Sequence, residues 1–325
     1  MNASQAVVAP QSGPAWWLWF KRIAGLLFVL LVAGLLVSQA RAIEWGEVLT
    51  ALEDYPLTAA WGAALLAVVS FTLYSCFDLL GRHYTGHGLG TRTVMSTAFV
   101  SYVFNLNMGS LVGGVAMRYR LYSRLGLKTG VVTRVISISM LTNWMGYLLL
   151  AGLVFSLMPP TLPDAWPVSE GQLRLAGVVL VAIAGAYVCA CAFVKRRRFS
   201  LRGHSIELPS ARLACLQLLM GAANWLVMSC ILFILFQYRI EFPAVVSVLL
   251  LAAVAGVITH IPAGLGVLEA VFVALLSHLM PQPELLAALV AYRVLYYIAP
   301  LALAVLMYLT MEARAKAKKS GKRQL

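Results

Sequence analysis

The sequence predicts an all-α, polytopic membrane protein with six transmembrane helices and two re-entrant helical hairpins that enter from opposite faces. Three observations predict this class. Of the 325 residues, 61% are hydrophobic and 11% are charged, whereas roughly 25% are charged in an ordinary soluble domain. The apolar residues form runs long enough to cross a bilayer, and two further apolar segments are interrupted by glycine, asparagine or proline. A soluble or disordered chain could not keep this much apolar surface out of water.

Six runs have the length of a membrane span, because roughly 20 apolar residues cross the hydrocarbon layer as a helix. They are Ile23–Ala40, Leu57–Phe77, Val135–Met158, Leu175–Val194, Leu213–Phe236 and Leu285–Met311. The sequence is therefore divided into a cytoplasmic N-terminal segment (1–22), a single membrane domain (23–311) and a basic cytoplasmic tail (312–325).

Two other apolar segments do not read as simple spans. Thr93–Met117 lacks charged residues, yet it contains two asparagines and three glycines. Phe242–Met280 is too long for one span and is interrupted by the sequence His-Ile-Pro-Ala-Gly-Leu-Gly at 260–266. We interpret both as hairpins, at about 93–117 and 242–280, that enter and leave the membrane on the same side.

The distribution of Lys and Arg supports this interpretation. With two hairpins and the N-terminus in the cytoplasm, every basic residue faces the cytoplasm except Arg41, Arg174, Arg239 and Arg293. Cytoplasmic loops carry such an excess of positive charge in most membrane proteins. If Thr93–Met117 crossed the membrane instead, the basic loops would divide between the two faces. The asymmetry therefore predicts a multi-pass protein with both termini in the cytoplasm.

Broken helices within a membrane indicate a binding site. Non-helical backbone is tolerated there only inside protein or along a wet cavity, and paired breaks from opposite faces are typical of secondary transporters. The helix that follows each break presents its positive end, which favours an anion. The candidate residues at the two tips are Asn107, Gly113 and Gly114 in the first hairpin, and His260, Pro262, Gly264 and Gly266 in the second.

Ionisable residues within apolar segments are costly and suggest function. Asp78, Arg118, Glu269 and Arg293 have this position, although Asp78 at the end of a span is also compatible with a place at the interface. One interpretation is a structural ion pair, for example between Glu269 and Arg293. The other is that Arg118 and Arg293 contact a lipid phosphate while Glu269 balances charge or carries a proton.

Further basic residues follow the first hairpin. Arg120 and Arg124 would gather an anionic headgroup near the cytoplasmic face. The net charge of +13 is then explained by loops that face anionic lipid, and we expect no nucleic-acid partner, because no basic and aromatic strip of a soluble fold is present.

Known catalytic and cofactor motifs do not occur in the sequence. There is no metal-ligand spacing, nucleotide-binding loop or nucleophile elbow, so we expect no cofactor and no ATP-driven transport. A lipid-modifying enzyme would need clustered catalytic groups at one depth, and Glu269 is the deep carboxylate of the sequence. We therefore expect a protein that is not an enzyme.

Several motifs, in order along nearly the whole chain, resemble the YbhN family of bacterial inner-membrane proteins. They are FDLLGR at 77–82, VGG at 112–114 with MRYRLYSRLG at 117–126, TNW at 142–144, HIPAGLGVLEA at 260–270 and AYRVLYY at 291–297. That family is related to the flippase-like membrane region of lysylphosphatidylglycerol synthases. The resemblance implies a lipid-handling membrane domain of Gram-negative bacteria, sometimes encoded beside a cardiolipin synthase. We expect no counterpart of the synthases' aminoacyl-transfer domain after Met311.

The function expected from residues and resemblance together is translocation of anionic phospholipids across the bacterial inner membrane. The headgroup would be held between the two broken helices. The alternative is a non-catalytic membrane partner of a lipid-synthesising enzyme such as cardiolipin synthase. Movement of lipid between leaflets would favour the first, and co-purification with a synthase without such movement would favour the second. The sequence does not predict the oligomeric state.

Overall fold

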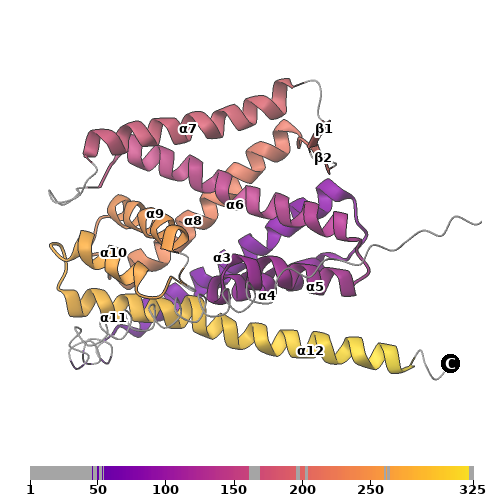
Figure 1. The fold of residues 1–325 in the computed structure, drawn as a ribbon. Coiled ribbons are helices and arrows are strands. Elements are labelled where there is room, and N and C mark those ends of the chain that lie inside the picture. Colours follow the sequence, from indigo (N-terminus) through magenta and orange to yellow (C-terminus); the bar gives the residue numbers. More distant parts are fainter. Residues whose placement is uncertain are drawn as a thin grey trace, which may run out of the picture. The chain divides into compact units, whose positions relative to one another are not determined.

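The computed structural model describes residues 46, 50, 53, 55–160, 169–194, 198–201, 204–259, 261 and 264–321. The expected N-terminal segment (1–22) and first span (Ile23–Ala40) lie outside the described residues, as do His260 and Pro262. Within the described part the chain is almost entirely helical, as expected (Figure 1). Two short strands between α7 and α8 form an antiparallel hairpin in which Arg198 lies opposite Glu207 and Leu201 lies opposite His204.

The elements follow one another in this order. They are α3 (Leu57–Thr85), α4 (Thr91–Met108), the π-helix η1 (Ser110–Ala116), α5 (Met117–Arg124), α6 (Thr129–Leu157), α7 (Glu170–Phe193), β1 (Arg198–Leu201), β2 (His204–Glu207), α8 (Ala211–Leu235), α9 (Phe242–Thr259), α10 (Val267–Leu276), α11 (Gln282–Arg293), the π-helix η3 (Val294–Ile298) and α12 (Ala299–Gly321).

Six helices of the described part are long and apolar enough to cross a membrane: α3, α6, α7, α8, α9 and the continuous stretch Gln282–Ala313. Five of them match expected spans. The remaining helix, α9, was expected to be one arm of a hairpin. Its 18 residues correspond to about 27 Å at 1.5 Å per residue, close to the thickness of the hydrocarbon layer. Length alone therefore makes α9 a candidate span as well.

Several helices begin earlier than the apolar runs predict. α6 begins at Thr129 and α7 at Glu170, so that each includes an arginine, Arg134 or Arg174, in its first two turns. Arginine can extend from a helix end into the headgroup region, so a helix continues past the point where hydropathy falls. The side chain of Ser169 caps α7 by accepting a hydrogen bond from the backbone N–H of Gln172. α12 continues to Gly321, so the expected tail (312–325) begins as part of this helix.

Glycine allows the long helices to approach closely. α6 crosses α8 where a Cβ on Gly146 would lie 2.2 Å from the carbonyl carbon of Gly221. α6 meets α7 where a Cβ on Gly177 would lie 2.5 Å from the backbone nitrogen of Ser156. Small residues at such crossings are the usual means by which helices pack in lipid, where apolar surface alone gives no preference for protein over acyl chains.

The first broken segment is a helical hairpin. α4 leads to Gly109, where φ is +84°, and the chain then returns along η1 and α5. Gly113 lies against the backbone of α4, since a Cβ there would be 2.0 Å from the carbonyl oxygen of Phe104. The expected tip residues, Asn107, Gly113 and Gly114, lie on either side of the reversal. The reversal itself is at Gly109, because it requires a positive φ, while Gly113 and Gly114 provide the close approach.

The first hairpin starts and ends at the same end of the long helices, where α3 ends and α6 begins. Gly81, near the end of α3, lies against Val135 of α6, with 3.0 Å between a Cβ placed on Gly81 and the Cα of Val135. The second broken segment, α9 and α10, starts and ends at the other end, where Arg239 before α9 forms an ion pair with Glu284 of α11. Two hairpins therefore open toward opposite ends. Their re-entrance into a membrane stays a prediction.

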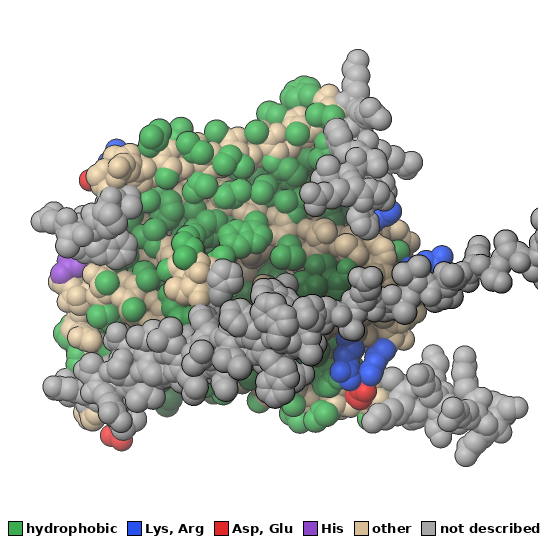
Figure 2. All heavy atoms as spheres, viewed as in Figure 1, with side chains coloured by type: hydrophobic (Ala, Val, Ile, Leu, Met, Phe, Trp, Pro, Cys, Tyr) green, Lys and Arg blue, Asp and Glu red, His purple; other side chains and the backbone are tan. Residues whose placement is uncertain are grey.

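The contacts of α8 with α3 show how these two ends of the helices are connected. Leu213 at its start packs with Leu80 near the end of α3. Near its finish, the carbonyl oxygen of Leu235 accepts a hydrogen bond from the hydroxyl of Tyr55, just before α3. Hence α3 and α8 are antiparallel. In Figure 2, charged side chains gather toward the ends of the helices while hydrophobic side chains cover the surface between them, as a membrane-spanning protein requires.

Candidate functional site

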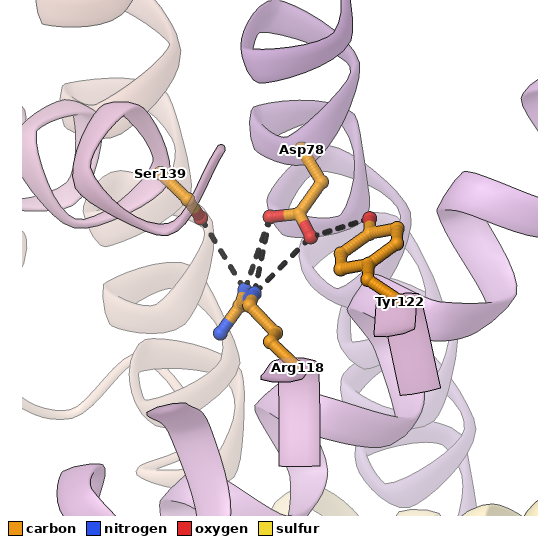
Figure 3. Close-up of polar contacts among 4 residues, drawn as sticks. All are labelled: Asp78, Arg118, Tyr122 and Ser139. Carbon is orange, nitrogen blue, oxygen red and sulfur yellow. Dashed lines mark hydrogen bonds and ion pairs between the residues drawn. The ribbon is translucent and has the colours of Figure 1, made fainter. Parts of the chain in front are cut away.

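A buried ion pair joins the first hairpin to α3 (Figure 3). Arg118, in the first turn of α5, directs its Nε to Asp78 Oδ2 at 3.1 Å and its Nη2 to Asp78 Oδ1 at 3.2 Å. The hydroxyl of Tyr122 donates to Asp78 Oδ2 at 2.8 Å, and Arg118 Nη2 also donates to Ser139 Oγ of α6 at 3.3 Å. Three elements, α3, α5 and α6, are therefore held by one carboxylate and one guanidinium.

Both charges are removed from solvent. The side chain of Asp78 is 0% exposed and that of Arg118 is 3% exposed. A buried pair of this kind is stable only when further hydrogen bonds satisfy its remaining atoms, which Tyr122 and Ser139 provide. The sequence left open an interfacial place for Asp78 and a lipid contact for Arg118. The structure buries both residues and pairs them with each other.

Arg120 and Arg124 lie on the exposed face of α5. Both approach Glu312 of α12, Arg120 at 3.7 Å and Arg124 at shorter range, and the guanidinium of Arg120 lies 5.5 Å from the ring centre of Tyr308. The hydrogen bond to Glu312 raises the pKa of the Arg124 guanidinium above its ordinary value. Because both arginines are about half exposed, they remain accessible to an anion at this end of the helices.

A second ion pair holds the other hairpin. Glu269 lies in the first turn of α10, which starts after Gly266 (φ +76°), and the positive end of this helix favours a carboxylate. Arg293, the last residue of α11, donates from Nη2 to Glu269 Oε2 at 2.9 Å and to the carbonyl oxygen of Gly264 at 3.0 Å. Its Nε donates to Glu269 Oε1. The interpretation of Glu269 and Arg293 as an ion pair is confirmed.

The second pair is less enclosed than the first. The side chains of Arg293 and Glu269 are 13% and 19% exposed, whereas Asp78 and Arg118 are almost fully buried. The guanidinium of Arg293 also lies 5.3 Å from the ring centre of Tyr297, within the range of a cation–π contact. Of these two pairs, the one at the second hairpin is the one that a ligand can reach.

Both hairpins contact the same short segment of the last helix. Asn107, just before the reversal at Gly109, donates from Nδ2 to the carbonyl oxygen of Tyr297 at 3.5 Å. Arg293, one turn earlier, binds the carbonyl oxygen of Gly264 in the second hairpin. The π-helix η3 follows Arg293 directly, contains Tyr297 and precedes Pro300. Proline has no N–H, and π-helical turns within α-helices are frequent at functional sites. We call the segment Arg293–Ile298, together with Asn107 and Gly264 that contact it, the hairpin junction.

A polar and aromatic cluster lies beside the junction in the core. Ser70 of α3 donates to Asn224 Oδ1 of α8 at 2.9 Å and lies 2.7 Å from the hydroxyl of Tyr296. Tyr102 of α4 stacks on Tyr74, with ring centres 3.4 Å apart. This cluster links α3, α4, α8 and η3, so that the first hairpin and the junction are tied to the long helices by hydrogen bonds.

The predicted glycines have structural rather than exposed positions. A Cβ on Gly114 would lie 2.7 Å from the Asn105 side-chain oxygen, so the first-tip glycines face α4. Gly264 and Gly266 have φ values of +56° and +76° and shape the turn that offers a carbonyl to Arg293. The contribution of the tyrosines at 102, 122, 296 and 297 was not predicted. Tyrosine is common in membrane helices, so its presence alone indicates no site. The one available signal is that Tyr122 lies in the motif MRYRLYSRLG and that Tyr296 and Tyr297 lie in the motif AYRVLYY.

These features together define a multi-pass α-helical membrane protein with two opposed helical hairpins that meet at one helix. Comparison with known proteins agrees: residues 22–304 match the family described as "Lysylphosphatidylglycerol synthase TM region". The chain belongs to this family. The match covers the described helices from α3 to the beginning of α12.

Three curated relatives are similar to this chain. It is 46% identical over 307 residues to "Inner membrane protein YbhN" of Escherichia coli K12, covering 94% of this chain and 96% of that protein. It is 30% identical over 306 residues to an uncharacterized protein of Synechocystis, covering 92% and 94%. "Phosphatidylglycerol lysyltransferase" of Staphylococcus haemolyticus is 30% identical over 105 residues, which are 31% of this chain and 12% of that protein.

Proposed function

We propose that this protein translocates anionic phospholipids between the leaflets of a bacterial inner membrane, with the headgroup held at the hairpin junction and both termini in the cytoplasm. The observation that carries the proposal is the convergence of two hairpins, opening toward opposite ends, on the segment that contains Arg293 and Tyr297. A site reached from both ends of the helices is what alternating access to two leaflets requires.

Arg293 is the residue that would take the phosphate. Its planar guanidinium already binds a carboxylate through two nitrogens, and phosphate offers the same paired acceptor geometry. A headgroup phosphate would therefore compete with Glu269 for the same two donors. Release of Glu269 would free the second hairpin from α11, which couples headgroup binding to hairpin movement.

The class of lipid is supported by the family and by charge. The family is named for a synthase whose product is a modified phosphatidylglycerol, and the staphylococcal relative is named as a lysyltransferase of that lipid. The basic residues Arg120 and Arg124 at one end of α5 would attract an anionic headgroup, at about 1 kcal/mol for each cation near a charged surface.

The experiment is leaflet exchange in vesicles. Purified protein is placed in phosphatidylcholine vesicles that carry a trace of fluorescent phosphatidylglycerol, cardiolipin or phosphatidylcholine, and an impermeant quencher reports the lipid that reaches the outer leaflet. We expect exchange of the two anionic lipids well above that in protein-free vesicles, and much slower exchange of labelled phosphatidylcholine.

Equal exchange in vesicles with and without protein would contradict the proposal. Such a result, together with co-purification of a lipid synthase, would favour the alternative role of a non-catalytic partner. Chemical conversion of the labelled lipids, measured by mass spectrometry in the same vesicles, would contradict the expectation that the protein is not an enzyme.

A further inference from the structure

An apolar groove lies between α3, α4 and the last helix, and Leu295 of η3 lines it where it borders the hairpin junction. Its volume is about 490 Å³, within the range of roughly 300–1,000 Å³ that small-molecule sites occupy. Its walls are mostly apolar, with Ala67 and Phe71 from α3, Phe99 from α4, and Leu303 and Met307 from α12 among them. Since all three walls belong to membrane helices or to a hairpin beside them, an acyl chain is the apolar occupant that these walls fit.

A basic residue stands at one end of this groove. Arg92 lies three and four residues before Met95 and Ser96, which line the groove, so that it shares their face of α4. Side chains on a helix tilt toward its N-terminus, which directs Arg92 beyond the end of the groove. Arg92 is exposed and has no ion pair with any other residue that the structure describes.

A second arginine lies next to this position. Arg82, in the last turn of α3, donates from Nη1 to the hydroxyl of Thr91 at 2.9 Å. The two cations Arg82 and Arg92 therefore lie at the same end of the groove, where α3 ends and α4 begins. An apolar channel with cations at one end complements a molecule that has an acyl chain and a negative headgroup.

We propose that this groove binds one acyl chain of an anionic phospholipid while Arg92, assisted by Arg82, binds the headgroup phosphate. This lateral site would supply lipid to the hairpin junction, and in that respect it rests on the proposed function. Phosphatidylglycerol fits it better than a zwitterionic lipid, because phosphatidylcholine carries its own cation beside the phosphate. One arginine near a lipid surface favours an anionic lipid by about fivefold, and we assign this preference to Arg92.

The test is photo-crosslinking, which measures binding without transport. Purified protein in phosphatidylcholine nanodiscs receives a trace of phosphatidylglycerol or phosphatidylcholine with a diazirine in one acyl chain, and mass spectrometry locates the label. We expect label on peptides that contain residues 295–307 and 95–99, with about fivefold more from phosphatidylglycerol than from phosphatidylcholine.

Two pairs of variants separate charge from shape. Arg92→Gln should bring the ratio of phosphatidylglycerol to phosphatidylcholine label toward one, whereas Arg134→Gln, at an exposed arginine of α6 that does not line the groove, should leave it unchanged. Leu303→Trp fills the groove and should lower labelling by both lipids several-fold. Leu306→Trp changes a similarly exposed residue of α12 that does not line the groove and should have no such effect.

Either of two results would overturn the inference. One is equal labelling by phosphatidylglycerol and phosphatidylcholine in the unaltered protein, or a ratio of the two labels that Arg92→Gln does not change. The other is absence of label in the groove together with a cross-link from Leu303→Cys to residues 23–40, which would show that the chain's own segment covers the groove. Leaflet exchange is measured separately. Label in the groove without lipid exchange would remove the proposed function and keep this site. Lipid exchange without label in the groove would keep the proposed function and remove this site.

Discussion

Four ionisable residues in apolar surroundings form two pairs, and each pair fixes one hairpin to a long helix. Asp78 binds Arg118, and Glu269 binds Arg293. All four could be chosen from the sequence, because a charge in an apolar segment is costly and therefore unusual. One pairing, Glu269 with Arg293, was also predicted. The other was not, since Asp78 and Arg118 are 40 residues apart and meet only after the first hairpin has folded back.

The buried pair can be tested by removing one charge. Asp78→Asn leaves Arg118 buried without a counter-charge, which typically costs about 3–5 kcal/mol. Ser139→Ala removes one neutral partner of the same guanidinium and should cost about 1.5–3 kcal/mol, the range for a hydrogen bond to a charged group. Thermal unfolding in detergent should therefore show a larger loss of stability for Asp78→Asn, with partial recovery when Arg118→Gln is added. Equal losses for Asp78→Asn and Ser139→Ala would show that the pair does not stabilise the fold.

At the scale of elements, interruptions in apolar segments predicted both hairpins but not their details. The predicted tip residues, Asn107, Gly113 and Gly114, surround the reversal at Gly109, but a sequence of several glycines does not show which one adopts a positive φ. The π-helix η3 was not predicted either. It contacts α3 through the hydroxyl of Tyr296 and α4 through the carbonyl oxygen of Tyr297, and hydropathy does not encode such contacts. The helix boundaries differ most at the ends of α3 and α12, which reach Thr85 and Gly321 rather than Phe77 and Met311.

Close packing within the first hairpin can be tested at Gly113. In Gly113→Ala the added Cβ would lie 2.0 Å from the carbonyl oxygen of Phe104, so η1 must move away from α4, at a cost of about 1–3 kcal/mol or more. The matched control is Gly185→Ala in α7, where no atom lies within 4 Å of the new Cβ, and where alanine should stabilise the helix by up to about 1 kcal/mol. Thermal unfolding of the two variants should shift in opposite directions, and a shift in the same direction would contradict the packing described.

For the whole molecule, the class of protein followed from composition and from the distribution of charge. The excess of Lys and Arg on one set of loops agrees with α3 running antiparallel to both α6 and α8, and with hairpins that open toward opposite ends. What sequence could not supply is the depth at which the hairpins meet, because that depends on contacts between segments far apart in the chain. α9 illustrates this: it is long enough to be a span, yet its partner α10 has only 10 residues.

The most direct test of the central claim is leaflet exchange of fluorescent phosphatidylglycerol by the double variant Glu269→Gln/Arg293→Gln. Two glutamines can bond to each other, and replacing both partners leaves no uncompensated charge, which is what makes loss of a single partner costly. The control is Glu170→Gln/Arg174→Gln, which neutralises an exposed ion pair on α7. We predict that both variants unfold near the temperature of the unaltered protein, that the control exchanges lipid at the normal rate, and that the first variant exchanges it at least about tenfold more slowly, the factor for 1.4 kcal/mol. Equal exchange rates in the two variants would contradict the assignment of the hairpin junction as the lipid site.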